Sequence, residues 1–573
     1  MNETIALIGS GPTAIYSLRK LLSSARPLEI TVFEKEAVAG RGMPYHPAVN
    51  DRAMLANIAS IEIPPIGETL VEWLERQPPE ELDRLRVHPA HINDREFFPR
   101  VVLGEYFKAQ FDGVVASGRA AGHSVTIKAG CEVSDVALQP DEIRVTVSRP
   151  DLPSEHYAFG HVVMATGHSF PDLTEVKPGY FASPWPAPLL KGIAAGRVGI
   201  LGTSLSGIDA MVTVATSHGT FYHDEAGLLE YHRAAGSEGL SISLMSRKGM
   251  LPEADFYFPI PYAPLSICTD AAVDELIASG RDDLLDAVFG LFREELTAAD
   301  PDYAAKIGLA GLTVETIEAA YFADRQESDP FLWAALNLAE AKQNYETHTT
   351  VAWRYAILRM HEVVARVVPH LNVRDLKRFH RHFKSLFVDD YATVPHASIE
   401  RVLALRRAGV LDIVALGGDY DLDIDTPERG AIITRPEGEL VFDTLVDATG
   451  QGRLGADEIP FPSLRRQGGV SKASALSEGQ VRIGDQPMTE QETGGIALDG
   501  AFRLVVDQPL SNRLYCLALP FLLHQFPFVQ GITSSNELGE TVANAILADI
   551  AKPQAQASVS APALDREPEL LVR

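Results

Sequence analysis

Apolar runs broken by short polar turns predict a mixed α/β chain. Residues 4–8 and the run "HVVMATGH" (His161–His168) are largely apolar, which is typical of parallel strands buried on both faces. The segment "EITVFEK" (Glu29–Lys35) predicts a second strand close to the first in the chain. In contrast, "EIRVTVSR" at 142–149 alternates apolar and polar residues, a period that suits an antiparallel ribbon.

The strand pattern returns later in the chain, after a long helical stretch. From about Asp270 to Arg407 the pattern is largely helical, and Thr349–Val368 is one strongly apolar helix. A closing helix is expected at 534–550, and the Pro-, Ala- and Ser-rich tail after Lys552 is expected to be disordered. Further strands are expected at Arg197–Leu201, Leu240–Gly249, Leu440–Gly452 and 512–519.

The first glycine-rich turn, "GSGPTA", lies between the first strand and a helix. Gly9 permits a tight turn, Gly11 lets the backbone approach a pyrophosphate, and Ala14 keeps the helix close to the strand. The helix N-terminus then offers free amides and a positive dipole end to phosphates. Glu34 ends the next strand, where a carboxylate accepts hydrogen bonds from a ribose hydroxyl. The context favours a dinucleotide site over an empty Rossmann-like turn.

Several further motifs carry a resemblance to a known protein family. "MATGH" places Ala165, Thr166 and Gly167 at a strand end, and the sequences "GRGMPY", "LANIASIEIP", "FFPRVVLGEYF", "SPWP", "SRKG", "VDATG" and "FPFVQGITSSNELGETVANAIL" follow elsewhere. In this order they resemble a bacterial FAD/NAD(P)-binding family, some members of which, including L-aspartate N-monooxygenases, are similar to N-hydroxylating flavin monooxygenases. The resemblance implies bound FAD. It places cofactor contacts at Lys35, Tyr45, Asn57, Thr166, Gly167 and Gly531 as well as at the first loop.

A second loop, "GTSLSG", repeats the pattern with one change. Gly202 and Gly207 keep the turn glycine and the helix-packing glycine, while Ser204 replaces the middle one. The next strand ends in Ser246, followed by Arg247 and Lys248 instead of an acid, which suits the 2′-phosphate of NADPH and disfavours NADH. The alternative is that both cations are ordinary surface charges.

The spacing after this loop departs from the usual pattern. Forty-four residues separate Gly202 from Ser246, against about 20 in a simple dinucleotide fold. We expect the intervening stretch, 217–239, to insert an extra helix, which leaves the placement of the two cations open.

These observations predict an α/β fold with two Rossmann-like dinucleotide-binding domains, each built in three layers around a mostly parallel sheet, and a helical insert. The FAD-binding domain is expected at 1–195 and again at 456–551, and the NADP-binding domain at 196–269 and again at 408–455. The helical insert, 270–407, is expected to bind substrate, and 552–573 form the tail.

Composition narrows the class of protein. A chain of 573 residues with 46% hydrophobic residues predicts two to four globular domains. The net charge of −27 argues against general binding to nucleic acid or anionic membranes. Three scattered cysteines predict neither a zinc site, nor any other metal site, nor a dithiol redox centre, and no signal peptide is evident, so a cytoplasmic protein is expected. The oligomeric state, a homo-oligomer included, stays open.

With FAD and NADPH both bound, the remaining question is what accepts the electrons. Since the cysteines exclude a dithiol acceptor, molecular oxygen is the expected one, and a small-molecule amine the expected substrate. The resemblance suggests N-hydroxylation of a small amino acid, L-aspartate among them. The alternatives are an NAD(P)H-dependent flavin reductase or dehydrogenase with a non-oxygen acceptor, and a flavin-binding regulatory protein without turnover.

Substrate contacts leave few signals in the sequence. Arg354 and Arg359 lie on the apolar helix, where a cation must reach solvent, pair with an acid or meet a ligand. His168 follows the A-T-G motif and is a plausible neighbour of the cofactors. The basic stretch "RDLKRFHRHFKS" (Arg374–Ser385) is expected to be a solvated helix face, with a cleft for an acidic substrate as the alternative.

Overall fold

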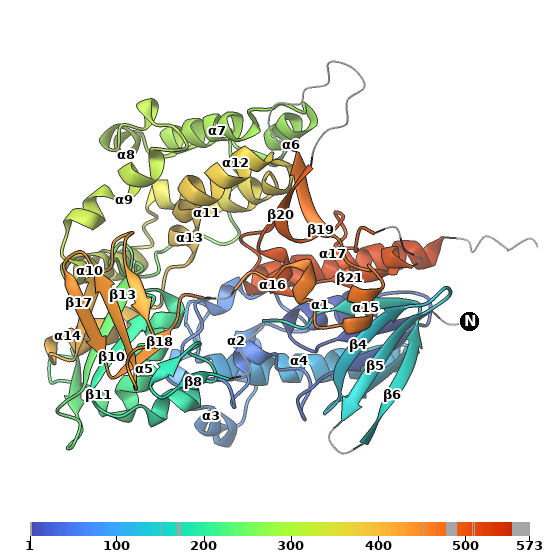
Figure 1. The fold of residues 1–573 in the computed structure, drawn as a ribbon, viewed down its shortest axis with the longest axis horizontal. Helices are drawn as coiled ribbons and strands as arrows, with labels where there is room; N and C mark the ends of the chain where they lie inside the picture. Colours follow the sequence, from blue (N-terminus) through green and yellow to red (C-terminus); the bar gives the residue numbers. More distant parts are fainter. Residues whose placement is uncertain are drawn as a thin grey trace, which may run out of the picture.

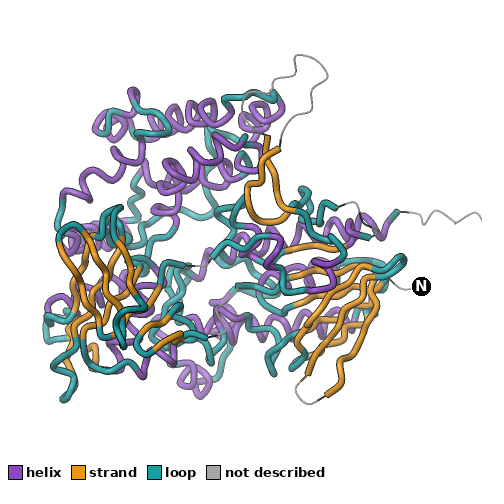
Figure 2. The backbone as a smooth tube through the Cα atoms, in the orientation of Figure 1, coloured by secondary structure: helices purple, strands orange, loops and turns teal. Residues whose placement is uncertain are grey.

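The computed structural model describes residues 3–149, 152–168, 173–450, 452–476, 490–506, 508 and 510–552. The predicted disordered tail lies outside the described residues. Two sheet-containing parts lie at opposite ends of the molecule, and a helical part lies above them in the view of Figure 1. Figure 2 shows the same division by secondary structure. Within the described residues, no helix has both the length and the apolar character needed to cross a bilayer.

The first sheet has the strand order β21-β7-β1-β2-β3, and all neighbouring strands run parallel. Side chains alternate between its faces, so Ile5 and Leu7 pack under a helical layer while Ala6 and Ile8 pack under a small antiparallel sheet. The strands are β1 (Thr4–Ile8), β2 (Glu29–Phe33), β3 (Ser124–Lys128), β7 (His161–Met164) and β21 (Leu514–Cys516). The layers above and below are α1 (Pro12–Leu21), α4 (Arg100–Ala120) and α17 (Ile532–Ala551), and β4 (Glu132–Leu138), β5 (Ile143–Arg149) and β6 (Leu152–Phe159).

The second sheet repeats this plan. Its order is β14-β13-β10-β18-β9-β8, and only the β8–β9 pair is antiparallel. Val198 and Ile200 face the helices, whereas Leu201 and Met245 face a second antiparallel sheet. The strands are β8 (Glu175–Lys177), β9 (Tyr180–Phe181), β10 (Arg197–Leu201), β13 (Ser241–Ser246), β14 (Leu411–Ala415) and β18 (Thr444–Asp447), covered by α5 (Leu205–Ser217) and by β15 (Asp421–Asp423), β16 (Ala431–Arg435) and β17 (Gly438–Phe442). The predicted fold class is therefore confirmed.

The expected extra helix after the second loop is wrong, because these residues form a β-hairpin. Strands β11 (Gly219–His223) and β12 (Leu229–Arg233) pair antiparallel. Phe221 lies opposite Tyr231, with ring centroids 5.1 Å apart, and the Tyr231 hydroxyl donates to the Ala215 carbonyl of α5 at 2.8 Å. Cross-strand aromatic pairing and this anchor to α5 outweigh the helical tendency of the segment.

The helical part confirms the pattern seen between Asp270 and Arg407. The apolar helix predicted at Thr349–Val368 is shorter, from Ala352 to Ala365, and a 3-10 turn follows it at Val368–His370. Its helices are α6 (Asp270–Ala278), α7 (Leu284–Ala299), α8 (Pro301–Lys306), α9 (Ile317–Glu327), α10 (Pro330–Thr347), α11 (Ala352–Ala365), α12 (Val373–Arg378), α13 (Lys384–Tyr391) and α14 (His396–Arg407). The remaining elements are α2 (Leu70–Glu75), α3 (Pro79–Leu85), α15 (Pro462–Arg466), α16 (Leu519–Leu522), β19 (Lys472–Leu476) and β20 (Glu490–Ile496).

A buried ion-pair network holds the helical part to the segment that follows β13. Glu253 of that segment pairs with Arg354 of α11 and accepts a hydrogen bond from the Trp333 indole at 2.8 Å. Arg325 of α9 bonds Asp389 of α13 at 2.6 Å. Asp390, fully buried beside Arg354, has a pKa raised well above its usual range by desolvation. Arg325 also lies 3.7 Å from Glu253, so the two arginines and the three acids form one connected network.

Removing one member of this network should destabilise the protein. We expect Arg354→Met to lower the free energy of unfolding by about 3 kcal/mol, because Glu253 loses its main counter-charge while it stays buried. Arg359→Met is the matched control, since among the described residues that guanidinium donates to backbone carbonyls alone, those of Tyr355, Ala263 and Pro264. Thermal unfolding of the two variants measures the difference, and equal midpoints would contradict a structural role for Arg354.

Candidate cofactor site between the two sheets

The first glycine loop is shaped by a close contact between two strand ends. Gly9 has φ +105°, and a Cβ at this position would lie 2.2 Å from the Ala165 carbonyl oxygen at the end of β7. Only glycine fits there. The next residue, Ser10, donates from Oγ to Glu34 Oε2 at 2.6 Å, which fixes the carboxylate at the end of β2 beside the loop. The N-terminus of α1 opens at Pro12 directly after this turn.

A cavity of about 450 Å³ lies over this loop. Gly42 also belongs to its wall, and its Cα would lie 3.3 Å from a Cβ at Gly11, so the two glycines let the backbones meet. Ala14 is buried in α1, as its packing role requires, and Asn57 is exposed and lies outside the lining. The predicted residues that line the cavity are Gly9, Gly11, Glu34, Lys35, Tyr45, Thr166, Gly167, His168 and Gly531.

The motifs "GRGMPY" and "FFPRVVLGEYF" contact each other at Tyr45. A Cβ at Gly104 of α4 would lie 2.4 Å from the Tyr45 carbonyl oxygen, so the helix needs glycine where it crosses this segment. The Tyr45 ring lies 5.2 Å from Phe107, and burial raises the pKa of its phenol to about 12. Tyr45 is therefore a neutral hydrogen-bonding group in the cavity wall.

The second loop repeats the geometry of the first. Gly202 has φ +117°, and a Cβ there would lie 2.5 Å from the carbonyl oxygen of Ala448, the alanine of the second A-T-G. A Cβ at Gly207 would lie 2.2 Å from the Gly202 carbonyl oxygen, so this glycine lets α5 pack on the turn. Ser204 is the N-cap residue of α5, and its hydroxyl makes no capping hydrogen bond among the described residues.

The end of β13 occupies the place that Glu34 has in the first sheet. Leu201 pairs in parallel with Met245, and Thr203 Oγ1 donates to Ser246 Oγ at 3.2 Å. Ser246 therefore stands beside the second loop as Glu34 stands beside the first, in spite of the inserted hairpin. No carboxylate occupies this position.

The two cations after Ser246 have different surroundings. Lys248 pairs with Glu318 of α9 at 2.6 Å, and its ammonium lies 4.0 Å from the centre of the Phe322 ring. The Arg247 side chain is exposed and has no ion pair within the described part of the chain. Arg247 is thus the cation that remains available to a ligand at this strand end.

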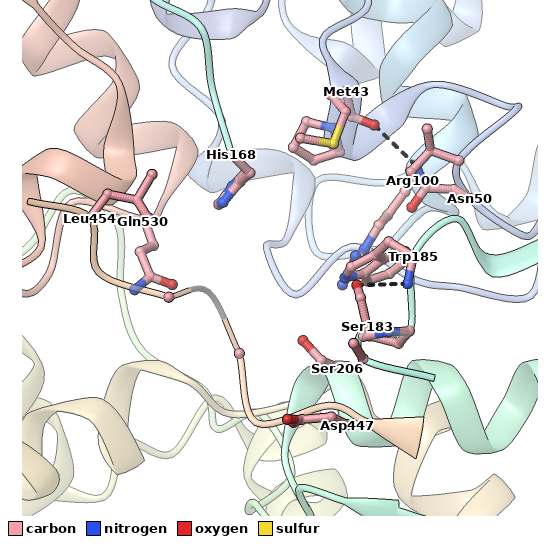
Figure 3. Close-up of a pocket in the computed structure, with 16 residues that line it drawn as sticks. Met43, Asn50, Arg100, His168, Ser183, Trp185, Ser206, Asp447, Leu454 and Gln530 are labelled. Carbon is pink, nitrogen blue, oxygen red and sulfur yellow. Dashed lines mark hydrogen bonds between the residues drawn. The ribbon is translucent and has the colours of Figure 1, made fainter. Parts of the chain in front are cut away.

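A second cavity, of about 440 Å³, lies between the two loops (Figure 3). Ser206 and Asp447 come from the second sheet, whereas His168 and Gln530 point in from the first. The two cavities are contiguous, because both are lined by Met43, Pro44, Val49, His168, Leu454 and Gln530.

Two polar features mark the second cavity. One is a buried amide oxygen without a hydrogen-bond partner, and the other is an ion pair between the two sheet-containing parts. Asn50 is 4% exposed, and its Oδ1 has no hydrogen-bond partner among the described residues. Arg100 of α4 forms an ion pair with Asp209 of α5 at 2.6 Å, and its guanidinium lies 5.3 Å from the centre of the Trp185 ring. Burial raises the pKa of Asp209 to about 6, while Arg100 opposes the shift. The pair joins the two dinucleotide-binding parts beside the cavity.

Sequence reasoning missed Asn50, Arg100, Trp185 and Asp209. Arg100 and Trp185 lie in the motifs "FFPR" and "SPWP", so the sequence marked these positions. It did not indicate which residues they contact. Asp209 is the single charged residue of α5, and its partner Arg100 is 109 residues away in the chain.

The predicted substrate residues are only partly brought to the cavities. His168 lines both, whereas Arg354 and Arg359 line neither of them. Of the three alternatives for Arg354, the structure shows pairing with buried acids. Arg359 reaches backbone carbonyls near the surface and lies over the Tyr355 ring. A substrate contact by either arginine therefore has no support in the geometry.

Comparisons with known proteins agree with this architecture. Residues 6–169 match a family described as FAD-NAD(P)-binding, and residues 269–391 match the YdhS-like middle domain. L-lysine 6-monooxygenase from Pseudomonas syringae is 12% identical, with a TM-score of 0.51, over 96% of this chain and all of that one. The ornithine N-hydroxylase of Kutzneria sp. 744 is also 12% identical, with a TM-score of 0.49 and the same coverage.

The match over residues 6–169 confirms the predicted FAD- and NAD(P)-binding domain. The likeness to L-lysine 6-monooxygenase confirms the fold with two dinucleotide-binding domains. A full-length relative is the protein YdhS of Escherichia coli (strain K12), which is 43% identical over 547 residues, 95% of this chain and 97% of that protein. The chain therefore belongs to the YdhS family of FAD/NAD(P)-binding proteins.

Proposed function

We propose that this protein is an FAD-dependent monooxygenase that uses NADPH and oxygen to hydroxylate the amine nitrogen of a small amino acid. The observation that carries the proposal is the contiguity of two cavities, one over the first dinucleotide loop and one that reaches the second loop at Ser206. A ligand held by the first loop and a ligand held by the second would meet at the shared wall. We also propose that the domain boundaries are those expected from the sequence.

The first cavity fits FAD. The glycine turn and the N-terminus of α1 would hold its pyrophosphate, and Glu34 would accept hydrogen bonds from its ribose. When bound, FAD supplies the capacity to take a hydride from NADPH and deliver two electrons to oxygen. The overall change is NADPH, a proton, oxygen and an amine giving NADP⁺, water and a hydroxylamine.

The second loop would hold NADPH. Ser246 replaces the carboxylate that would repel a 2′-phosphate, and exposed Arg247 offers a bidentate donor at the same strand end. Ser204 places a hydroxyl where the pyrophosphate passes, so it would supply a hydrogen bond in place of the closer approach that glycine allows.

The walls of the second cavity would orient the reacting groups. The unsatisfied Oδ1 of Asn50 would accept a hydrogen bond from the amine, because a buried acceptor without a partner is costly. The Arg100–Asp209 pair and Trp185 would close the opposite side against water. L-aspartate is the substrate that we propose from the family resemblance.

A screen of amino acids tests this function. We expect the purified protein to hold FAD, and one or more amino acids to accelerate NADPH oxidation with matching formation of hydroxylamine. Rapid mixing of the reduced protein with oxygen, and separately with a quinone or ferricyanide, distinguishes a monooxygenase from a reductase. A reductase would pass its electrons to the quinone or ferricyanide and form no hydroxylamine. A regulatory protein would hold FAD that NADPH does not reduce. NADPH oxidation that no amine changes would overturn the proposal.

The coenzyme preference is expected to depend on Arg247. Arg247→Ala should raise the KM for NADPH about tenfold and leave that for NADH unchanged, because only NADPH carries the 2′-phosphate. Lys248→Ala is the matched control, and a smaller change is expected because Glu318 already pairs with that ammonium. Steady-state kinetics with both coenzymes measures the effect, and an equal rise for NADPH and NADH would contradict this assignment.

A further inference from the structure

Two cationic side chains and a histidine gather where the helical part meets the first cavity. We call His380, Lys384 and Arg453 the junction cluster. His380 lies in a π-helical turn at Phe379–Phe383, a kind of distortion that is frequent at functional sites, and Lys384 begins α13 directly after it. Arg453 stands between Gly452, which lines the second cavity, and Leu454, which lines both.

Specific contacts hold the chain segments of the cluster against residues 520–530. Beside Arg453, the Leu454 amide donates to the Pro520 carbonyl oxygen at 3.1 Å. His380 Nε2 lies 3.2 Å from the carbonyl oxygen of His524, three residues after Phe521 of the first cavity wall. Phe528, from the same segment, is buried in the core of the helical part, with its ring 6.1 Å from Phe379. Two residues later, Gln530 lines both cavities. The junction cluster is therefore placed beside the proposed reaction site by packing.

The charges of the junction cluster are not neutralised by acids. Neither Lys384 nor Arg453 forms an ion pair in the described part of the chain. Burial, with the charge of Arg453 as a smaller cause, lowers the pKa of Lys384 to about 8. Burial also lowers the pKa of His380 to about 4, again with Arg453 and Lys384 contributing, so this ring is neutral at pH 7.

Two buried polar atoms at the same place lack partners. His380 Nδ1 and Ser385 Oγ have no hydrogen-bond partner among the described residues. A neighbouring cation shows the contrast, since Arg378 bonds Asp286, Glu315 and Asp375. His380 Nδ1 is an acceptor, because Nε2 carries the proton that faces the His524 carbonyl, whereas the Ser385 hydroxyl can donate. In a protein of net charge −27, unpaired cations beside this unsatisfied hydroxyl indicate a site for an anion.

We propose that the junction cluster binds a carboxylate of the substrate, so that the substrate is a small organic anion held between the helical part and the flavin-binding part. The statement about substrate rests on the proposed function, whereas the binding of an anion does not. Lys384 and Arg453 would supply the charge, and the Ser385 hydroxyl would donate a hydrogen bond, while His380 holds this turn against the His524 carbonyl.

Calorimetric titration of the FAD-loaded protein with succinate tests the site. We expect saturable binding that weakens at least tenfold in Lys384→Ala. Lys377→Ala is the matched control, because Lys377 is exposed in the same basic stretch and has no ion pair within the described residues. The affinity of this variant for succinate should stay unchanged. Lys384→Arg should bind within threefold of the natural protein, which separates loss of charge from loss of fold.

The outcomes distinguish this inference from the proposed function. Equal affinity in Lys384→Ala and Lys377→Ala, or no saturable binding to the natural protein, would overturn the carboxylate site. Inorganic phosphate is titrated in parallel, and phosphate binding without succinate binding would also overturn it. Failure of NADPH to reduce the bound flavin would instead contradict the proposed function, and it leaves the calorimetric result unaffected.

Succinate binding should also depend on pH. We expect affinity to fall as pH rises through about 8, because the Lys384 ammonium then loses its proton. Arg453 is the charged group that acts on Lys384, and burial lowers the pKa of Arg453 from its ordinary value, while His380 is neutral throughout this range. In Lys384→Arg the affinity should stay level between pH 7 and 9. A level profile in the natural protein would contradict the role of Lys384.

Discussion

One steric constraint recurs at both dinucleotide loops and fixes the positions of the surrounding groups. In each sheet the first strand must turn into its helix directly against the end of a neighbouring strand. A Cβ at Gly9 would lie 2.2 Å from the Ala165 carbonyl oxygen, and a Cβ at Gly202 would lie 2.5 Å from that of Ala448. Each contact joins a glycine loop to an A-T-G motif. The motifs occur as pairs because each pair forms one packed junction, and the helix that follows can start with its amides free only if that junction closes.

The junctions also explain why two separate sheets form one site. Residues just beyond the first A-T-G, such as His168, and just beyond the second, such as Gly452 and Leu454, leave their sheets at these points and line the cavities between them. The ion pair of Arg100 and Asp209 then joins α4 to α5 across the same space. The helical part is attached by Phe528, which is buried among its helices while Gln530 remains at the cavity wall. The position of each cavity wall thus follows from backbone packing and from a few long side chains.

The sequence was sufficient for features that are local or periodic. Parallel strands, the glycine loops and the helical stretch each follow from spacing within about 30 residues, as in the βαβ unit. Contacts between distant segments were not predictable in this way. Arg354 on an apolar helix admitted three roles, and only the fold shows that Glu253, a hundred residues earlier, pairs with it. The helix expected in place of the β11–β12 hairpin is wrong, because the stabilising contact between Phe221 and Tyr231 exists only once the two strands pair.

The placement of cations separates structural charge from charge that can serve a ligand. Arg354 and Arg325 are buried against Glu253 and Asp389, so their charges are balanced inside the fold. Arg378 is matched by three acids of the same helical part, two at the surface and the buried Asp375. Lys384, six residues further along the chain, has no such partner in the described structure, although partial burial makes its charge costly. An exposed cation without an acid, such as Lys377, is solvated by water, whereas a partly buried one such as Lys384 gains more from an external anion. Since that lysine lies where the helical part contacts the cavity wall, the anion site that we propose would let the helical part contribute to substrate binding.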